Sequence, residues 1–340
     1  MRFEYYNQGI DNVPKLSVDG TVDRSLHFSH WQGNQTPAEV KADTSTEIAL
    51  KLVTSPNRAQ LTEGIELVTN NHFDTDGVLS VWTVLTGERA AELHHQLISA
   101  AEAGDFSEFT NEDGVRTSIA IQGSDQASPE NETGSPLAAS LAHESVDDDA
   151  RAYELVLPEV EKLLRRPGDY ESLWCGPWEQ IARAIESFER GASSVTASSD
   201  GRVALVNLAP EGFSASGFHP TRHAAPFTAI SRYARGELFV IATPVDDGWI
   251  YRIDYPYYSW AETVVRPRVP RRDFSAVLAD LNQLEQNRAA RWQKDSGEMT
   301  SAVKFLNAGG QQAPSRLGPE AVAERFAAAL ASKREAAVGD

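Results

Sequence analysis

The chain lacks several features that would place it in a familiar class of proteins. Cys175 is the only cysteine among 340 residues, which excludes an internal disulfide and a zinc site built from several thiolates. No uninterrupted apolar run approaches the ~18 residues that indicate a membrane span. The first residues show no apolar signal-peptide core either. We therefore expect a cytoplasmic protein with no membrane partner.

Basic residues are also scarce. Lys and Arg total 31 against 49 Asp and Glu, so the formal net charge is −18 at pH 7. A chain this acidic is not expected to wrap duplex nucleic acid with a broad basic face. An anionic substrate would need a local source of positive charge. Hydrophobic residues make up 41% of the chain and charged residues 24%, which is typical of a globular protein with a large core.

The hydrophobic patterns predict an α/β fold: a mostly parallel sheet with flanking helices, a helical middle region and a mixed α+β C-terminal region. Turn-forming residues between 123 and 136 indicate a mobile surface loop. We divide the chain into a metal-binding α/β region (1–125), a loop and helical region (126–195) and a C-terminal region (196–340). Strands are expected at 26–28, 65–68, 203–208, 238–243 and 249–253, and helices at 77–85, 86–104, 273–284 and 319–330.

The most informative stretch is residues 65–85, IELVTNNHFDTDGVLSVWTVL. His72, Asp74 and Asp76 follow a predicted strand at alternate positions, so a continued extended chain would project them to one side. One imidazole and two carboxylates suit Mn²⁺, Mg²⁺ or Zn²⁺. Gly77 would let the backbone turn sharply before a helix whose N-terminus can face an anion. The competing interpretation is a surface turn in which both aspartates cap the helix.

HFDTDGVLS, residues 72–80, resembles the first motif of the DHH phosphoesterase family. Members of that family hold two Mn²⁺ ions and hydrolyse phosphodiester or phosphoanhydride bonds with a metal-activated water. By this resemblance, His72 and Asp74 would hold one ion and Asp76 the other, with Asp74 and Asp76 also serving catalysis.

The family also has a bridging aspartate and the Asp-His-His motif, which normally follow the first motif, and no such triplet follows Ser80. Upstream, Asp19 ends a strand-like run and His30 precedes a loop, and residues 42–50 look like the helix start that follows Asp-His-His in the family. We therefore expect a rearranged order in which Asp19 bridges the ions and His30 binds the second. The alternative is that Asp19 lies in a turn and His27 or His30 packs on Trp31.

Phe73 to Leu79 also resembles the first motif of haloacid-dehalogenase-type phosphatases, in which Asp74 would be a covalent nucleophile with Mg²⁺. That family has an apolar strand running into the first aspartate, whereas Thr69-Asn70-Asn71-His72 stands here. A third interpretation is a non-catalytic protein whose cluster binds one structural ion.

Several further residues are weaker candidates. Asp105 is a further metal ligand or a loop residue, and Ser80 a substrate contact. Arg266 and Arg268 lie in an arginine-rich segment near several aromatic residues, which indicates either an anion-binding patch or ion pairs with an acidic body. His94, His95, His219 and His223 are expected outside the metal shell. The predicted function is metal-dependent hydrolysis of a small phosphorylated substrate or short oligonucleotide, with Mn²⁺ as the preferred ion; the patterns do not indicate an oligomeric state.

Overall fold

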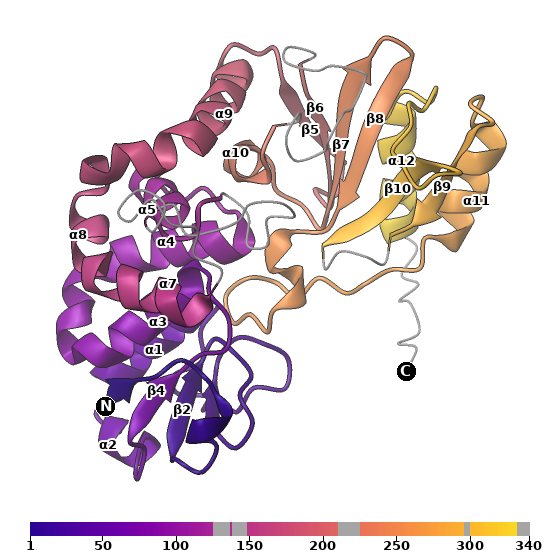
Figure 1. The fold of residues 1–340 in the computed structure, drawn as a ribbon. Coiled ribbons are helices and arrows are strands. Elements are labelled where there is room, and N and C mark those ends of the chain that lie inside the picture. Colours follow the sequence, from indigo (N-terminus) through magenta and orange to yellow (C-terminus); the bar gives the residue numbers. More distant parts are fainter. Residues whose placement is uncertain (125–136, 138–147, 210–224, 296–299, 332–340) are drawn as a thin grey trace. The chain divides into compact units, whose positions relative to one another are not determined.

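A computed structural model describes residues 1–124, 137, 148–209, 225–295 and 300–331 (Figure 1). The chain forms two compact units. The first contains Met1–Glu179 and a later segment, Trp260–Pro267; the second contains Gln180–Ser259 and the chain from Arg268 onward. The predicted mixed α/β class is confirmed. Most of the predicted loop at 123–136 lies outside the described residues, and the three predicted regions remain a prediction.

The first unit is built on a small parallel sheet with the strand order β1-β4-β2-β3. Its strands are β1 (Arg2–Phe3), β2 (Lys15–Val18), β3 (Leu26–Phe28) and β4 (Leu67–Thr69). In the centre, Leu16 of β2 pairs with Val68 of β4 on one side and with Leu26 of β3 on the other. Because the strands are parallel, the residues that follow β2, β3 and β4 emerge at one edge of the sheet.

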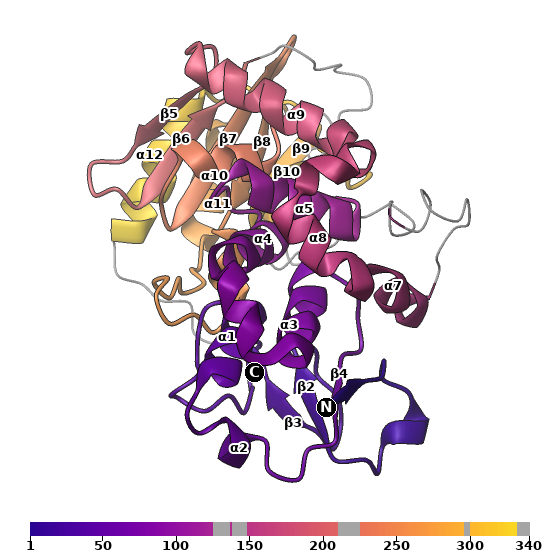
Figure 2. The same cartoon turned by 90° about the vertical axis from the view of Figure 1, so that its left-hand side faces the viewer.

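Helices α1 (Ser45–Thr54) and α3 (Thr75–Thr86) pack against each other and against this sheet (Figure 2). The apolar side chains of α3 are almost all buried, which explains why its sequence is apolar on every side. The remaining helices of this unit are α2 (Arg58–Leu61), α4 (His94–Phe106), α5 (Glu112–Gln122), α7 (Asp149–Val156) and α8 (Val160–Arg165), with short 3-10 helices at Gln8–Ile10, Gly87–Leu93, Leu157–Glu159 and Pro167–Tyr170. Helix α9 (Glu171–Glu189) continues from the first unit into the second.

The single helix predicted at 86–104 is wrong. Thr86, expected as an N-cap, is instead the last residue of α3, and Gly87 ends that helix with a φ of 70°. A 3-10 helix, Gly87–Leu93, follows, and α4 begins at His94. The break has a local cause, because a positive φ is incompatible with continuing a right-handed helix.

The second unit contains a mixed sheet with the strand order β5-β6-β7-β8-β10-β9. Strands β7 (Leu238–Val245) and β8 (Gly248–Asp254) form the predicted hairpin, with Asp246 and Asp247 in the turn. The other elements are β5 (Ser194–Ala197), β6 (Val203–Asn207), α10 (Phe227–Tyr233), a 3-10 helix at Tyr257–Trp260, α11 (Ser275–Leu284), β9 (Ala290–Lys294), β10 (Ser301–Asn307) and α12 (Pro319–Ala331). Among the described residues, no helix combines the length and apolar character needed to cross a bilayer.

Candidate metal centre

Asp19 is at the middle of a cluster of acidic and histidine side chains. It follows β2 directly and is fully buried. Its φ of 63° is in the left-handed region, which costs a non-glycine residue roughly 1–2 kcal/mol and turns the chain sharply at this point. Its carboxylate accepts hydrogen bonds from Ser45 Oγ at 2.8 Å and Trp31 Nε1 at 3.3 Å.

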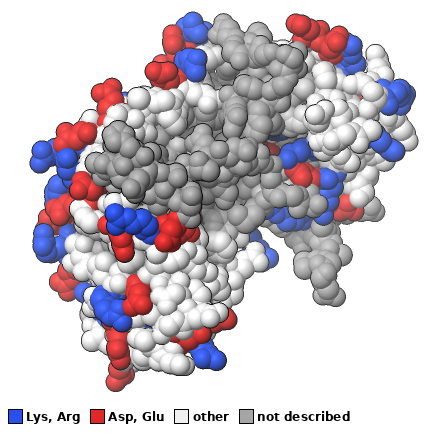
Figure 3. Space-filling view, in the orientation of Figure 1, with Lys and Arg blue, Asp and Glu red and all other residues white. Residues whose placement is uncertain are grey.

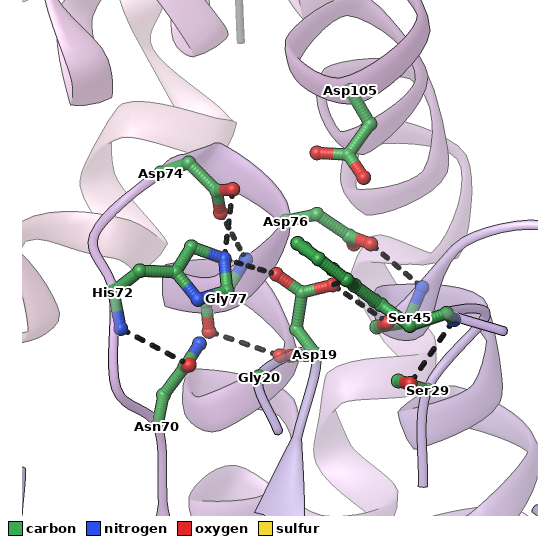
Figure 4. Close-up of polar contacts among 12 residues, drawn as sticks. Asp19, Gly20, Ser29, Ser45, Asn70, His72, Asp74, Asp76, Gly77 and Asp105 are labelled. Atoms are coloured by element: carbon green, nitrogen blue, oxygen red, sulfur yellow. Dashed lines mark hydrogen bonds and ion pairs between the residues drawn. The ribbon is translucent and has the colours of Figure 1, made fainter. Parts of the chain in front are cut away.

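His72 and Asp74 lie on one side of Asp19, and we call these three residues the outer group. His72 Nε2 lies 3.1 Å from Asp19 Oδ2 and 3.0 Å from Asp74 Oδ2 (Figure 4). The side chains of His72 and Asp74 are 30% and 14% exposed, so solvent reaches this group. The other oxygen of Asp74 accepts a hydrogen bond from Gly77 N at 2.7 Å, which makes Asp74 the N-cap of α3.

On the other side lies an inner group that consists of Asp19, His30, Asp76 and Asp105, all buried. His30 Nε2 lies 3.1 Å from Asp105 Oδ2, and His30 Nδ1 lies 3.5 Å from Asp76 Oδ2. Asp76 is held by the N-terminus of α1, because its two oxygens accept Ser45 N and Thr46 N at 2.7 Å each. The inner group is therefore fixed by the sheet edge, α1 and α4 together.

The donor sets of both groups fit a divalent metal ion. In each group one ligand atom per residue lies within 4.8 Å of all the others, and Asp19 belongs to both. Among the described residues, His30 Nε2 and Asp105 Oδ1 are buried and make no hydrogen bond, although His30 Nε2 lies 3.1 Å from Asp105 Oδ2. Buried polar atoms usually have hydrogen-bond partners, so these two atoms are suited to serve as metal ligands. Imidazole and carboxylate donors suit Mn²⁺, Mg²⁺ or Zn²⁺.

The charges in the cluster are unevenly compensated. Burial raises the pKa of Asp76 and of Asp105 well above the usual range, and neighbouring carboxylates raise both further. Burial acts in the same direction on Asp19, but the hydrogen bond and charge of His72 outweigh it and lower the pKa of Asp19 to about 2. Burial would lower the pKa of His72, yet Asp74 and Asp19 raise it to about 12. Neighbouring carboxylates thus raise the pKa of His72 in the outer group, whereas burial is the main cause of the raised pKa values of Asp76 and Asp105 in the inner group.

The structure brings six of the predicted residues together: Asp19, His30, His72, Asp74, Asp76 and Asp105. However, the prediction that His72, Asp74 and Asp76 project to one side of an extended chain is wrong. The extended chain does not persist to Asp76, because Asp74 caps α3 and Asp76 lies in its first turn. Asp76 therefore points into the inner group and not the outer one. This division of ligands corresponds to the one that the DHH resemblance implies.

Two neighbouring glycines act by their small size. A Cβ atom at Gly77 would lie 2.5 Å from Asn70 Nδ2 and 2.8 Å from the Tyr153 hydroxyl. One at Gly20 would lie 2.2 Å from Asn70 Oδ1. The sharp turn predicted at Gly77 is absent, because Gly77 lies within α3. Its N–H donates to Asp74 and is not offered to an external anion.

The predicted substrate contacts lie elsewhere. Ser80 is fully buried, and its hydroxyl donates to the carbonyl of Gly77 inside α3. The Arg266 guanidinium is paired with carboxylates of this chain, described below. Arg268 belongs to the second unit, and its role remains a prediction. His94 and His95 are exposed on α4, and the residues at 219 and 223 lie outside the described part of the chain.

Sequence reasoning missed the residues that hold the ligands in place. Ser45 and Thr46 position Asp76, while Asn70 and Tyr153 support the loop that carries His72. Tyr153 donates to the carbonyl of His72 at 3.1 Å and accepts from Asn70 Nδ2 at 3.0 Å. The polar pair Asn70-Asn71 directly after a strand was a usable signal. Nothing local marks Tyr153, which is 81 residues from His72.

The geometry defines a candidate divalent-metal centre at the edge of a parallel sheet. The chain belongs to a family of unknown function, DUF6687, whose sequence model matches residues 2–337. No curated protein matches the sequence. Among solved structures, the pGpG-specific phosphodiesterase PggH from Vibrio cholerae is similar, with 9% identity over 87% of this chain and 78% of that one and a TM-score of 0.36. A likeness at this TM-score carries no argument about fold or function.

Proposed function

We propose that this protein is a metal-dependent phosphoesterase that hydrolyses phosphodiester or phosphoanhydride bonds in a small phosphorylated substrate or short oligonucleotide. The observation that carries the proposal is the sharing of Asp19 between two ligand groups. Paired divalent ions joined by one carboxylate are the arrangement that phosphatases and nucleases use. The similarity of HFDTDGVLS to the first motif of DHH phosphoesterases supports the same class.

Each ligand has a distinct position in this proposal. Asp19 would bridge two ions, with Mn²⁺ the preferred metal. His72 and Asp74 would complete the outer site, and His30, Asp76 and Asp105 the inner site. When bound, the ions would supply positive charge for phosphoryl oxygens and an activated water for the attack.

Access distinguishes the two groups. The inner group is buried, whereas His72 and Asp74 are partly exposed, so we place the substrate on the outer side. The acidic residues there would repel a phosphate unless ions neutralise them. On the face shown in Figure 3, Lys and Arg side chains stand among Asp and Glu side chains. Two ion pairs of the first unit are those of Arg116 with Glu112 and of Arg165 with Glu161. Such interleaved charges do not form the continuous basic face that duplex nucleic acid requires.

The structure favours this proposal over a covalent mechanism at Asp74. Strand β4 ends at Thr69, and Asp74 is not at the strand end but caps α3 beyond an intervening loop. One oxygen of Asp74 is used as the N-cap of α3, where it accepts a hydrogen bond from Gly77 N. A nucleophilic aspartate needs an oxygen directed at the phosphorus atom. Borohydride trapping followed by peptide mapping tests this point, and a modified Asp74 would establish the covalent route.

The main experiment compares wild type with Asp74→Asn. Asparagine still caps α3 but removes a carboxylate from the outer group. Asp148→Asn is the matched control, since Asp148 is also a helix N-cap, of α7, but belongs to neither ligand group. After reconstitution with Mn²⁺, bound metal is measured by mass spectrometry and hydrolysis on a panel of dinucleotides, oligonucleotides and polyphosphate.

We expect wild type and Asp148→Asn to bind two ions and to hydrolyse at least one substrate in the panel. Asp74→Asn should lose one ion and at least 100-fold in kcat/KM, about 2.7 kcal/mol of transition-state stabilisation. Equal activity in Asp74→Asn and wild type would contradict the proposal. Tight binding of one ion without turnover on any substrate would instead support a structural metal site.

A further inference from the structure

One segment of the first unit comes from far along the chain. Residues Trp260–Pro267, which we call the strap, belong to the first unit although both flanking segments belong to the second. The first residues of the strap contact His30. The Trp260 ring lies 4.9 Å from the His30 ring in an edge-on arrangement, and Glu262 N donates to the carbonyl of His30 at 2.7 Å. Both the ring and the backbone of an inner-group residue are thus held by the strap.

The strap ends in an ion-pair network around Arg266. Its guanidinium lies 2.9 Å from Asp43, 2.7 Å from Glu102 and 2.6 Å from Glu108. It also stacks on Phe106, with 4.9 Å between Cζ and the ring centroid. Arg266 therefore contacts residues on both sides of Asp105 in the sequence: Glu102 before it, and Phe106 and Glu108 after it.

The same arginine is linked to α1. Asp43 is almost fully buried and accepts hydrogen bonds from three successive backbone N–H groups of the strap, those of Val264, Val265 and Arg266. Asp43 directly precedes Thr44, the N-cap of the helix whose first N–H groups hold Asp76. Arg266 therefore joins the element that positions Asp76 to the element that carries Asp105.

We propose that the strap is a positioning device for the inner metal site and that Arg266 is its principal positioning residue. This inference rests on the proposed function. A cation beside an acidic site would, by charge alone, weaken binding of a divalent ion. If Arg266 instead fixes the spacing of His30, Asp76 and Asp105, its loss will weaken binding, because supporting interactions commonly contribute 10–100-fold to metal affinity. Loss of Arg266 would therefore strengthen metal binding if only its charge matters, and weaken metal binding if it positions the ligands.

The test uses the full-length protein and Mn²⁺ titration by calorimetry, with the coupling between two Mn²⁺ ions followed by electron paramagnetic resonance. Asp74→Asn identifies which binding step belongs to the outer group. Arg266→Gln is the test variant, and Arg266→Lys keeps the charge but cannot span three carboxylates. Arg116→Gln is the matched control, because Arg116 also pairs with two carboxylates and stacks on aromatic rings but touches no residue of either group.

We expect Arg266→Gln to weaken the inner binding step at least 10-fold and to reduce the coupled signal, with the outer step unchanged. Arg266→Lys should be intermediate and Arg116→Gln normal. Should Arg266→Gln fail to fold, Glu108→Gln should weaken the inner step in the same direction. Unchanged or tighter inner binding in the variant that is measured would overturn the inference and leave the proposed function standing. Absence of Mn²⁺ binding by wild type would overturn both.

Discussion

Asp105 is a carboxylate in an unfavourable environment. It is buried, one of its oxygens has no hydrogen-bond partner among the described residues, and its pKa is raised well above the usual range by burial and by neighbouring carboxylates. A carboxylate with a raised pKa in the folded state costs stability at neutral pH. The Asp105 carboxylate therefore lowers the free energy of unfolding, while it is already positioned to bind a metal ion.

We predict that Asp105→Asn makes the metal-free protein more stable by about 1–3 kcal/mol at pH 7. The gain should grow as pH rises from about 4, where the unfolded aspartate ionises, and vanish below it. Denaturant unfolding in a chelator across pH 4–8 measures this. If the cluster binds Mn²⁺ as we propose, Mn²⁺ should stabilise wild type and should stabilise this variant less. A loss of stability in the chelator would contradict this account of Asp105.

Gly77 shows how closely the groups behind the cluster are packed. We predict that Gly77→Ala destabilises the protein by about 1–3 kcal/mol, because its methyl group would displace Asn70 and Tyr153. Gly168→Ala is the control, since nothing lies within 4 Å of a Cβ atom there and alanine at a glycine with a compatible backbone conformation stabilises by about 0.4–1 kcal/mol. Thermal unfolding should thus shift in opposite directions. Equal shifts would show that Asn70 and Tyr153 have room to move.

The helix α11 ends on a buried carboxylate that organises the second unit. Glu285 is 2% exposed and accepts hydrogen bonds from Trp292, Ser315 and the backbone N–H of Arg316. Burial would raise the pKa of Glu285, but these donors outweigh burial and lower it. The ionised side chain therefore joins the end of α11 to the middle of β9 and to the segment before α12.

We predict that Glu285→Gln lowers the free energy of unfolding by about 1–3 kcal/mol at pH 7. Because the folded pKa is depressed, this stabilisation is complete above about pH 4.3, the unfolded value, and is lost as pH falls through the folded pKa. Urea unfolding at pH 7 and pH 3 measures both, with Glu324→Gln on the exposed side of α12 as control. A difference that persists unchanged at pH 3 would rule out the charge as its cause.

The elements that sequence reasoning identified are those with a local cause. β3 is found at the predicted residues, where Leu26 and Phe28 alternate with His27, and α3 is found near its predicted limits, because its segment is mostly apolar. The region after Thr86 was mistaken because apolar spacing continues through a backbone break that depends on one glycine conformation. Periodicity records which residues are buried but not where the hydrogen-bonding pattern changes.

The cluster could be predicted only where its residues are close in sequence or follow a recognisable strand. His72, Asp74 and Asp76 are within one motif, and Asp19 follows β2. Asp105 was a weak candidate because nothing around α4 indicates that its end reaches the sheet edge. The partners of Arg266 are 158 to 223 residues away, and such pairings depend on the tertiary fold.

The division of the whole molecule into units does not follow the order of the chain. The chain leaves the first unit after Glu179, returns for the strap and leaves again after Pro267. During synthesis, the other parts of the first unit therefore emerge well before the strap. At about 5–20 residues per second, the intervening segment takes several seconds to make.

The first unit therefore cannot complete its folding during translation until the strap has been synthesised. Until Pro267 has left the exit tunnel, His30 lacks Trp260 and the end of α4 lacks Arg266. We predict that nascent chains stalled short of residue 260 are cleaved by protease near α4, whereas chains stalled well beyond residue 267 are protected there. Equal protection would mean that α4 docks without the strap. On our account the inner site matures only after Pro267 has emerged, so any ion it binds is acquired after that point and not by an earlier nascent chain.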